Sequence, residues 1–174
     1  MLRPAQAADR DRIRLWRNHP TVRGVSVTSH EITSDEHAAW FAATQDDPST
    51  RVLIYEYDGR PAGVVTFSAI SADNQSATWG FYLDNDGLDA TGDTMSAWMS
   101  CQREAIAYAF SELDLDRLDA EVRVENIVVR RMNQRLGFVE GDVTTRPGGV
   151  RVHPICLTRA TYERNQSKHK EHAR

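Results

Sequence analysis

Two patterns of apolar residues alternate along the chain. A period of two, typical of β-strands, runs through residues 51–57, 62–70 and 76–83. The first two segments are joined by Asp58-Gly59, the dipeptide most typical of a tight hairpin. A second turn signal, Asp73-Asn74, precedes the third segment. We therefore expect three consecutive antiparallel strands.

Longer segments follow the helical period instead. One runs over residues 94–113, where a single core-facing side is formed by Met95, Trp98, Met99, Ala105, Ile106, Ala109, Phe110 and Leu113. A second helix is expected after Glu125, and its buried residues would be Val128, Val129, Met132 and Leu136. Gly137 follows directly and suits a left-handed C-terminal cap. The sequence therefore predicts a long helix and a shorter one after the three strands.

The segment between these two helices alternates in polarity and is predicted to be a strand with two unlike faces. Asp119, Glu121 and Arg123 belong to its polar face. Residues 138–143 and 150–157 are expected to form a closing strand pair around Pro147-Gly148-Gly149. Residues 164–174 are polar and basic, which favours a disordered tail over a binding arm.

The N-terminal part is predicted to contain a strand and two helices. LRPA is strand-like, and residues 9–18 read as a helix that stops before Pro20, because a proline disfavours the helical conformation in the residue before it. Thr33 and Glu36 have the spacing of a capping box, which starts a second helix. The segment TVRGVSVTSHEI between them is expected to be a loop. Helices and strands mixed in this way indicate an α/β fold.

Length and composition limit the architecture and the partners. The chain has 174 residues, 40% of them hydrophobic, and this suits one folded domain, which we place at 1–163. A net charge of −4 and a pI near 5.8 give no overall attraction to nucleic acid, so a small-molecule partner is favoured. No apolar run approaches the roughly 18 residues of a membrane span. We expect a soluble, cytoplasmic protein without a membrane partner.

Two cysteines do not suffice for a disulfide framework or a Cys-based metal site. Cys101 lies within the long predicted helix and Cys156 near the end of a late strand. We expect two buried thiols and no metal.

The order of elements around Gly92 indicates a site for an anion. A strand, 76–83, is followed by the glycine-containing loop DNDGLDATGD and then by the start of the long helix at Thr94. The N-terminus of a helix presents unpaired backbone N–H groups, and these bind phosphate readily. The first hypothesis is a phosphate-bearing donor; the alternative is an ordinary turn at Gly92.

With these elements in place, the chain resembles the GNAT N-acetyltransferases over residues 2–162. The segments LWRNHPTVR, ITSDEHAAWF and AEVRVENIVVRRMNQRLGFVEGD are similar to the PseH branch, which N-acetylates the 4-amino group of a UDP-linked amino-dideoxy sugar, and more loosely to the RimJ/RimL-like protein acetyltransferases. The resemblance implies the GNAT fold, with a mostly antiparallel sheet of about seven strands and flanking helices.

The resemblance also implies acetyl-CoA as co-substrate. Its pyrophosphate would lie at the loop that enters the long helix and its pantetheine arm along the third strand; the residues implied are Phe81, Leu83, Thr91, Gly92, Asp93, Thr94, Met95, Asn126 and Arg131. The family loop usually reads Q/R-x-x-G-x-G/A with basic side chains, whereas this loop contains four Asp residues. Carboxylates in this loop repel an anion such as pyrophosphate. The loop expected to bind the donor is therefore one place where this chain departs from the family.

Acetyl transfer to an amine requires a group that accepts the amine proton and a group that protonates the thiolate. Glu121 matches the family position for the first role; the alternative is an ion pair with Arg123 or another base. Asn133 stands where the family usually has a Tyr for the second role, and an amide has no titratable proton to give. Tyr82, Tyr108 and water are alternative proton donors, and a packing role is favoured for Tyr108.

On the acceptor side, the resemblance points to Arg17, His37, Ser68 and Tyr82 as substrate contacts. Trp79, beside the expected cleft, is a further candidate as a platform for a sugar. An Arg suits a diphosphate because it can pair bidentately. Alternatives are a surface position for His37 and a core position for Trp79. A Lys common in the branch is replaced here by Ala69, which favours a different acceptor from that of the branch.

Three functions stay open at this point. The first is an acetyltransferase for an amino sugar or similar small amine, the second a Rim-type protein N-terminal acetyltransferase, and the third a GNAT-fold protein with another acyl donor, such as aminoacyl-tRNA, or without turnover. The acidic loop and Asn133 motivate the third, in which nucleic acid would be a partner. Family habit favours a homodimer. We prefer the first hypothesis.

Overall fold

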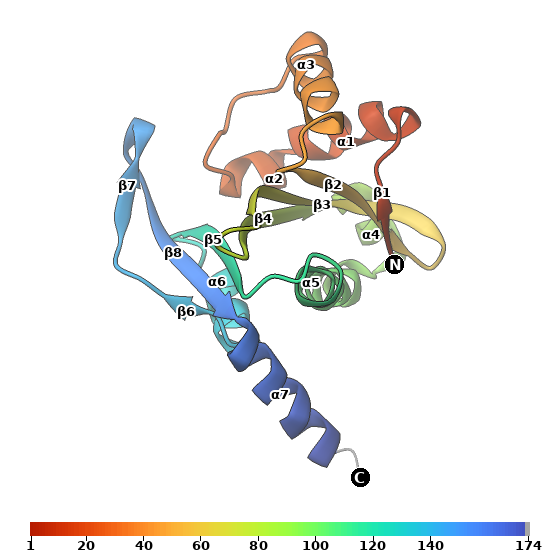
Figure 1. Ribbon diagram of the computed structural model, residues 1–174. Helices are drawn as coiled ribbons and strands as arrows, with labels where there is room; N and C mark the ends of the chain where they lie inside the picture. Colours follow the sequence, from red (N-terminus) through yellow and green to blue (C-terminus); the bar gives the residue numbers. More distant parts are fainter. Residues whose placement is uncertain (173–174) are drawn as a thin grey trace.

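One sheet of eight strands forms the centre of the molecule, in the order β1-β2-β3-β4-β5-β8-β6, with β7 also paired to β8. The computed structural model describes residues 1–172 (Figure 1). Every strand pair is antiparallel except β4 with β5. The strands are β1 (Leu2–Pro4), β2 (Arg51–Tyr57), β3 (Arg60–Ser71), β4 (Ser76–Leu83), β5 (Arg117–Arg123), β6 (Val139–Glu140), β7 (Thr144–Arg146) and β8 (Val150–Thr158). The predicted mixed α/β fold with a mostly antiparallel sheet is confirmed.

Helices cover both faces of this sheet (Figure 1). One face carries α1 (Arg10–Asn18), α2 (Pro20–Val25) and α3 (Ser34–Gln45), and the other carries α5 (Thr94–Ser111), α6 (Ile127–Leu136) and α7 (Arg159–His172). The short helix α4 (Asn85–Thr91) connects β4 to α5, and two 3-10 turns lie at Ala7–Asp9 and Pro147–Gly149. No helix within residues 1–172 is long and apolar enough to cross a bilayer.

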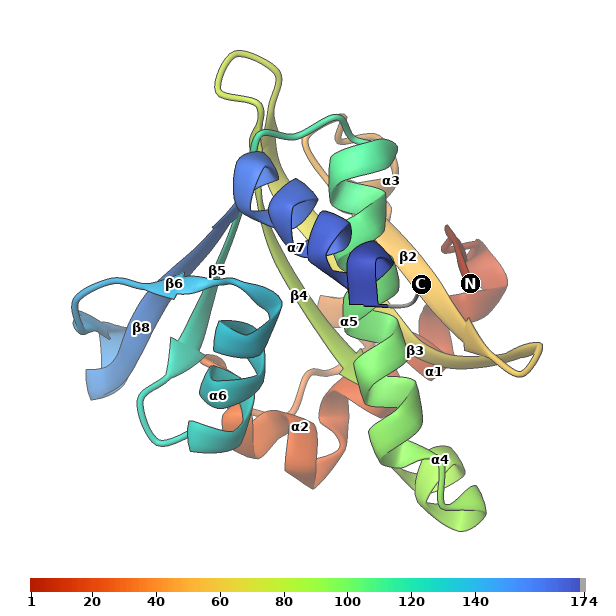
Figure 2. The ribbon, with the colours of Figure 1, turned by 90° about the horizontal axis from the view of Figure 1, so that it is seen from below.

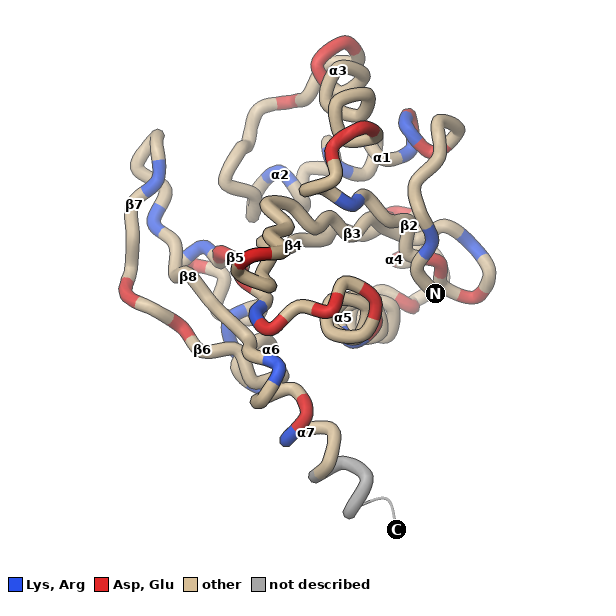
Figure 3. Tube along the Cα trace, in the orientation of Figure 1, with Lys and Arg blue, Asp and Glu red and all other residues tan. Residues whose placement is uncertain are grey.

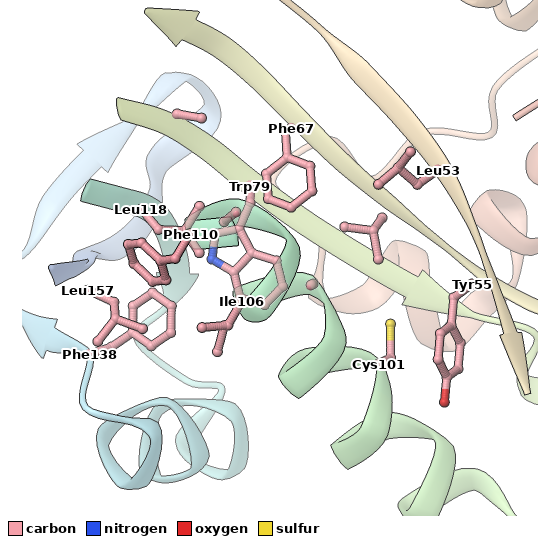
Figure 4. Packing of buried hydrophobic residues seen from close by; sticks show 14 of the residues in the cluster. Leu53, Tyr55, Phe67, Trp79, Cys101, Ile106, Phe110, Leu118, Phe138 and Leu157 are labelled. Carbon is pink, nitrogen blue, oxygen red and sulfur yellow. The ribbon is translucent and has the colours of Figure 1, made fainter. Parts of the chain in front are cut away.

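The core has two layers because successive strand residues point to opposite faces. Leu53 and Tyr55 of β2 belong to the cluster that packs against α5, whereas Val52 and Ile54 pack with residues of α1 and α3. Figure 4 shows the first layer, where Phe67 and Trp79 lie close to the side chains of α5. The alternation therefore assigns each residue of a central strand to one of two helical layers.

The sheet splits between β4 and β5. These strands pair only through Ser76–Arg117, Ala77–Leu118 and Thr78–Asp119. Beyond Thr78 they diverge, as Figure 2 shows, and β5 continues in register with β8 instead. Backbone groups of 79–83 that point away from β3 therefore have no strand partner. We call the space between the diverging strands the wedge.

Several local predictions are confirmed. Strands β2 and β4 have the predicted bounds, 51–57 and 76–83. The capping box of α3 is present, with the Glu36 N–H donating to Thr33 Oγ1 at 3.2 Å and the Thr33 N–H donating to the Glu36 carboxylate at 3.3 Å. Gly137 adopts a left-handed conformation, φ 98°, at the end of α6. Each of these features depends on neighbouring residues alone.

Two predicted loops are helical instead. Helix α4 occupies most of the segment expected to be a glycine loop, because Asp84 Oδ1 accepts the Gly87 N–H at 3.1 Å and Gly92 closes the helix in a left-handed conformation. Helix α2 lies in the segment after His19, with Pro20 in its first turn. Both helices are too short to show a helical period in the sequence.

The expected disordered tail at 164–174 is wrong over 164–172, which belong to α7; residues 173–174 lie outside the described residues. The start of α7 is fixed to the end of α5: the Tyr162 and Phe110 rings stack with centroids 4.8 Å apart, and Arg159 donates to the Phe110 carbonyl at 3.0 Å. Asn165 donates to the carbonyl of Leu136 at 3.3 Å. These contacts stabilise a helix whose sequence is polar.

Candidate functional site

A cavity of about 610 Å³ occupies the wedge. Its walls are residues 79–83 of β4 and 120–123 of β5, with residues of α2 on one face of the sheet and residues of α5 and α6 on the other. The cavity thus passes between two strands and is bounded by helices from both helical layers. A molecule bound in this cavity would contact the two strands and helices of both layers.

Aromatic and aliphatic side chains form the wall on the α5 and α6 face. Trp79 and Phe81 stack with ring centroids 5.6 Å apart, and Phe81 lies 5.9 Å from Trp98 of α5. Trp79 is 6% exposed and also stacks on Phe138, so it belongs to the core as well as to the wall. This wall suits an extended chain with little charge.

Two residues predicted to be buried core positions are exposed at this wall. Met95 is 60% exposed and Val128 is 67% exposed, and both line the cavity. The helical period identified the cavity-facing side of α5 and α6 together with the core-facing side, because an apolar cavity wall and an apolar core have the same residue pattern.

A buried pair of side-chain amides forms part of the same wall. Gln102 of α5 is 1% exposed and Asn133 of α6 is 4% exposed. Gln102 Nε2 donates to Asn133 Oδ1 at 3.2 Å, and both residues line the cavity. This hydrogen bond uses the oxygen of Asn133 and leaves its amide N–H groups available to a bound molecule.

The face toward α2 carries the polar groups of the two strands. Ala120 and Val122 pack in the cluster around α5, so Glu121 and Arg123, which alternate with them, point to the opposite face. Tyr82 packs against the cluster of α1 and α3 and also points to this face. Glu121, Arg123 and Tyr82 therefore all line the cavity on the side that α2 covers.

Glu121 is held in an ion pair. Arg146 of β7 donates from Nε to Glu121 Oε2 at 3.0 Å and from Nη2 to Oε1, and the hydrogen bond to Glu121 raises the pKa of Arg146. Acidic positions near β5 and basic positions on β7 are visible in Figure 3. The ion pair that sequence analysis gave as an alternative is therefore present, with Arg146 rather than Arg123 as the partner.

Tyr82 keeps its proton at neutral pH. Burial raises the pKa of its phenol, and the nearby positive charge of Arg17 only partly offsets this rise. Burial in turn lowers the pKa of Arg17, whose Nη2 donates to the carbonyl of Thr28 at 2.8 Å. Tyr82 can therefore act as a hydrogen-bond donor inside the cavity.

The residues expected to bind the CoA donor fall into two groups. Phe81, Leu83, Thr94, Met95 and Asn126 line the cavity, whereas Thr91, Gly92, Asp93 and Arg131 do not. The first turn of α5 has N–H groups without helical partners, as every helix has. Asp93 precedes it without a capping hydrogen bond, and Thr94 Oγ1 donates to Asp89. Two carboxylates, those of Asp89 and Asp93, therefore belong to residues next to this helix start.

Three of the four expected acceptor contacts lie away from the cavity. His37 is 3% exposed in α3, where its ring packs against Trp40 and Phe41, with centroids 5.2 and 6.4 Å away. The Ser68 hydroxyl faces the Thr78 carbonyl at 3.5 Å, on the closed side of the split. Arg17 reaches only the neighbourhood of Tyr82. Tyr82, the fourth, lines the cavity, as does Trp79, the further candidate.

Sequence analysis missed the α2 wall and three polar residues of the site. Thr21, Val22 and Val25 line the cavity from α2, and Ser26 and Val27 follow them. Gln102, Arg123 and Arg146 were not singled out as site residues. The one local signal was Pro20, which is common in a first helical turn and begins α2.

Comparison with known proteins agrees with this geometry. A family model described as "Acetyltransferase (GNAT) domain" matches residues 1–139. A search of curated protein sequences finds no match. The spermidine N-acetyltransferase of Vibrio cholerae, solved in complex with CoA and spermine, has a TM-score of 0.79 at 18% identity, covering 93% of this chain and 96% of that chain. Its manganese complex has a TM-score of 0.76 at 17% identity, covering 95% of each chain.

The likeness to these solved structures establishes the fold, and the family model adds the class of protein. The model spans the strands of the wedge, α5 and α6, which together form most of the cavity. The similarity to the PseH branch stays a prediction. Since the family model matches most of its length, the chain belongs to the family of GNAT acetyltransferase domains and is a GNAT-type acetyltransferase.

Proposed function

We propose that the protein transfers an acetyl group from acetyl-CoA to the primary amine of a small molecule, while both substrates are bound. The observation that supports this most directly is the cavity in the wedge, which has one wall from each helical layer. A donor held on the α5 and α6 face and an acceptor on the α2 face would meet between β4 and β5. Holding two reactants together in this way lowers the entropic barrier to their reaction.

In this reaction the amine nitrogen attacks the thioester carbonyl, an N–C bond forms, and the C–S bond breaks. The amine nitrogen loses a proton and the departing sulfur gains one. Unpartnered N–H groups of β4 beyond Thr78 are suited to polarise the carbonyl, because negative charge develops on its oxygen. Polarisation of the thioester carbonyl therefore does not depend on any one side chain.

Glu121 is our candidate for accepting the amine proton, directly or through a water molecule. It lines the cavity on the α2 face, and Arg146 fixes the position of its carboxylate. Its negative charge also stabilises the ammonium form of the amine electrostatically. Positioning and charge both support a role next to the acceptor nitrogen.

Protonation of the thiolate requires a different arrangement from the family Tyr. Asn133 can donate an amide N–H to the sulfur while Gln102 holds its oxygen, but it transfers no proton. Tyr82 retains its proton and lines the cavity, which makes it a candidate donor. The proton then comes from Tyr82 or from water.

Three of the expected contacts to a nucleotide-linked sugar lie outside the cavity. Arg17, His37 and Ser68, which the resemblance linked to a nucleotide-linked amino sugar, do not line the cavity. The Vibrio cholerae structure contains spermine, a polyamine. We therefore propose a small primary amine, and amino sugars, polyamines and N-terminal peptides are acceptors to be compared.

Two measurements on the whole chain test the proposal. Calorimetry with CoA is expected to show binding, and a thiol-release assay with acetyl-CoA is expected to show turnover with at least one small amine. Failure to bind CoA would overturn the donor and favour another acyl donor, such as aminoacyl-tRNA. Turnover confined to N-terminal peptides would favour the Rim-type alternative.

A further inference from the structure

The acceptor side of the cavity is unusually poor in groups that recognise charge or hydroxyls. Its α2 wall consists of Thr21, Val22, Val25, Ser26 and Val27. Val25 is 50% exposed and Val27 is 42% exposed, so apolar surface extends from the wall to the cavity mouth. Exposed apolar surface that continues into a cavity is a feature of binding sites for apolar groups.

Charged side chains are nearly absent from the cavity lining. Within the described residues, only Glu121 and Arg123 line it with a charge, and each already has a partner. Glu121 pairs with Arg146, and Arg123 donates to the carbonyl of Gly24 at 2.8 Å. A bound molecule can therefore pair with a charged side chain of this lining only if one of these contacts breaks.

The uncharged polar groups on this face are also few. The Ser26 hydroxyl donates to the carbonyl of Val22 at 2.7 Å, which ties it to the backbone of α2. The Thr21 and Thr66 hydroxyls, the Tyr82 phenol and the side-chain oxygen of Asn85 remain as directional partners. A sugar with several hydroxyl groups would leave most of them without hydrogen bonds here, and unpaired buried hydroxyls disfavour binding.

We propose that the acceptor is a monoamine with an apolar alkyl or aryl body, which lies against Val22, Val25 and Val27 while its amino group reaches Glu121. This inference rests on the proposed function and narrows its substrate class. A polyamine would bring a second ammonium group to an apolar wall without a free carboxylate. A nucleotide-linked sugar would bring a diphosphate to a wall whose one guanidinium, that of Arg123, is already bonded to Gly24.

The test is a thiol-release assay with acetyl-CoA and length-matched amines. Pentylamine and 1,5-diaminopentane differ only in the second amino group, and glucosamine represents the amino sugars. We expect kcat/KM for pentylamine to exceed the values for both others at least tenfold. From propylamine to pentylamine, kcat/KM should rise about fourfold per methylene, as burial of each CH₂ predicts. A kcat/KM for 1,5-diaminopentane or glucosamine that equals or exceeds the value for pentylamine would overturn the inference.

A variant tests the wall directly. Val25→Asp places a carboxylate on it and should raise kcat/KM for 1,5-diaminopentane at least fivefold while lowering that for pentylamine. Val139→Asp is the matched control, because Val139 is 65% exposed on β6 and does not line the cavity; it should leave both values unchanged. Thermal unfolding checks that both variants are folded. If Val25→Asp and Val139→Asp behave alike, the valine wall does not select the acceptor.

The outcomes separate this inference from the proposed function. Turnover with the diamine or glucosamine, but not with pentylamine, would leave the N-acetyltransferase reaction in place and overturn the apolar acceptor. CoA binding without thiol release from any amine would overturn both.

Discussion

Arg123 on β5 donates a hydrogen bond to the backbone carbonyl of Gly24 on α2, with 2.8 Å between Nη1 and the oxygen and 99 positions between the residues along the chain. The contact joins the second half of the split sheet to the helix that covers the cavity on the other face. Because the charged guanidinium of Arg123 binds the backbone of α2, the position of α2 depends on β5.

We expect Arg123→Ala to loosen α2. A hydrogen bond from a charged group contributes about 1.5 kcal/mol or more, so KM for the acceptor should rise about tenfold while the Kd of CoA stays the same. Hydrogen exchange of residues 20–27 should become faster. Arg103→Ala, on the exposed side of α5, is the control. Unchanged exchange at 20–27 would show that other contacts hold α2.

Removal of the Glu121 carboxylate should affect turnover rather than donor binding. Glu121→Gln is expected to lower kcat about a hundredfold, as for the loss of a general base, and to leave the Kd of CoA within about twofold. Stopped-flow thiol release and calorimetry measure the two quantities. Glu112→Gln, at the exposed end of α5, should behave as the parent protein. A parent-like kcat for Glu121→Gln would remove Glu121 from the base role.

The carboxylates at the start of α5 should weaken donor binding. In Asp93→Asn one negative charge is removed beside the helix N-terminus, so the Kd of CoA should fall about threefold at low salt, as expected for a charge of ~0.6 kcal/mol near a helix end. The gain should shrink at high salt because screening reduces it. Asp73→Asn, in the turn between β3 and β4, makes the same charge change elsewhere. Equal effects of the two substitutions would contradict a local role.

His37 should make stability depend on pH. Burial, followed by the charges of Arg14 and Arg10, lowers the pKa of His37 below its usual 6.5. Below pH 6.5 the unfolded chain binds a proton that the folded chain excludes, so the free energy of unfolding should fall as the pH drops from 6.5 toward the folded pKa. Urea unfolding at several pH values measures this slope. His37→Phe should have a flatter slope, and an identical slope in the variant would contradict the role of His37.

Gly137 should be the more sensitive of two left-handed glycines. At Gly137, φ is 98° and an added Cβ would lie 2.6 Å from Asn165 Nδ2, which bonds to the Leu136 carbonyl. At Gly59, φ is 74° and no atom lies within 4 Å of such a Cβ. Gly59→Ala should lower the free energy of unfolding by about 1 kcal/mol, from backbone strain alone. Gly137→Ala should cost about 2 kcal/mol or more, because it also displaces Asn165. Equal losses of unfolding free energy in the two variants, measured by chemical denaturation, would show that Asn165 of α7 does not restrict position 137.

Features set by neighbouring residues could be predicted from the sequence. The Thr33 and Glu36 capping box, the Asp58-Gly59 turn and the alternating strand β4 each depend on residues a few positions apart. Glu121 and Asn133 were expected at the site from the resemblance to the family rather than from neighbouring residues, and both line the cavity. Short helices such as α2 lacked enough residues for a periodic signal.

Features that depend on distant segments could not be predicted in this way. Strand β8 pairs with both β5 and β7, which brings Arg146 to Glu121, and nothing near either residue in the sequence indicates this pair. The contact of Arg123 with Gly24 is of the same kind. For this reason an ion pair of Glu121 could be given as an alternative, but Arg146 could not be named as the partner. The acceptor residues implied by the resemblance, Arg17, His37 and Ser68, do not line the cavity.

The three-residue pairing of β4 with β5 has a consequence for solubility and association. Beyond Thr78, β4 is in effect an edge strand inside a continuous sheet, and open edge strands can pair with strands of other molecules. Residues of α2, α6 and β5 line the cavity along this internal edge, so the edge faces these elements rather than the outer border of the sheet. The arrangement thus keeps unpaired backbone groups available to small molecules while protecting them from edge-to-edge aggregation.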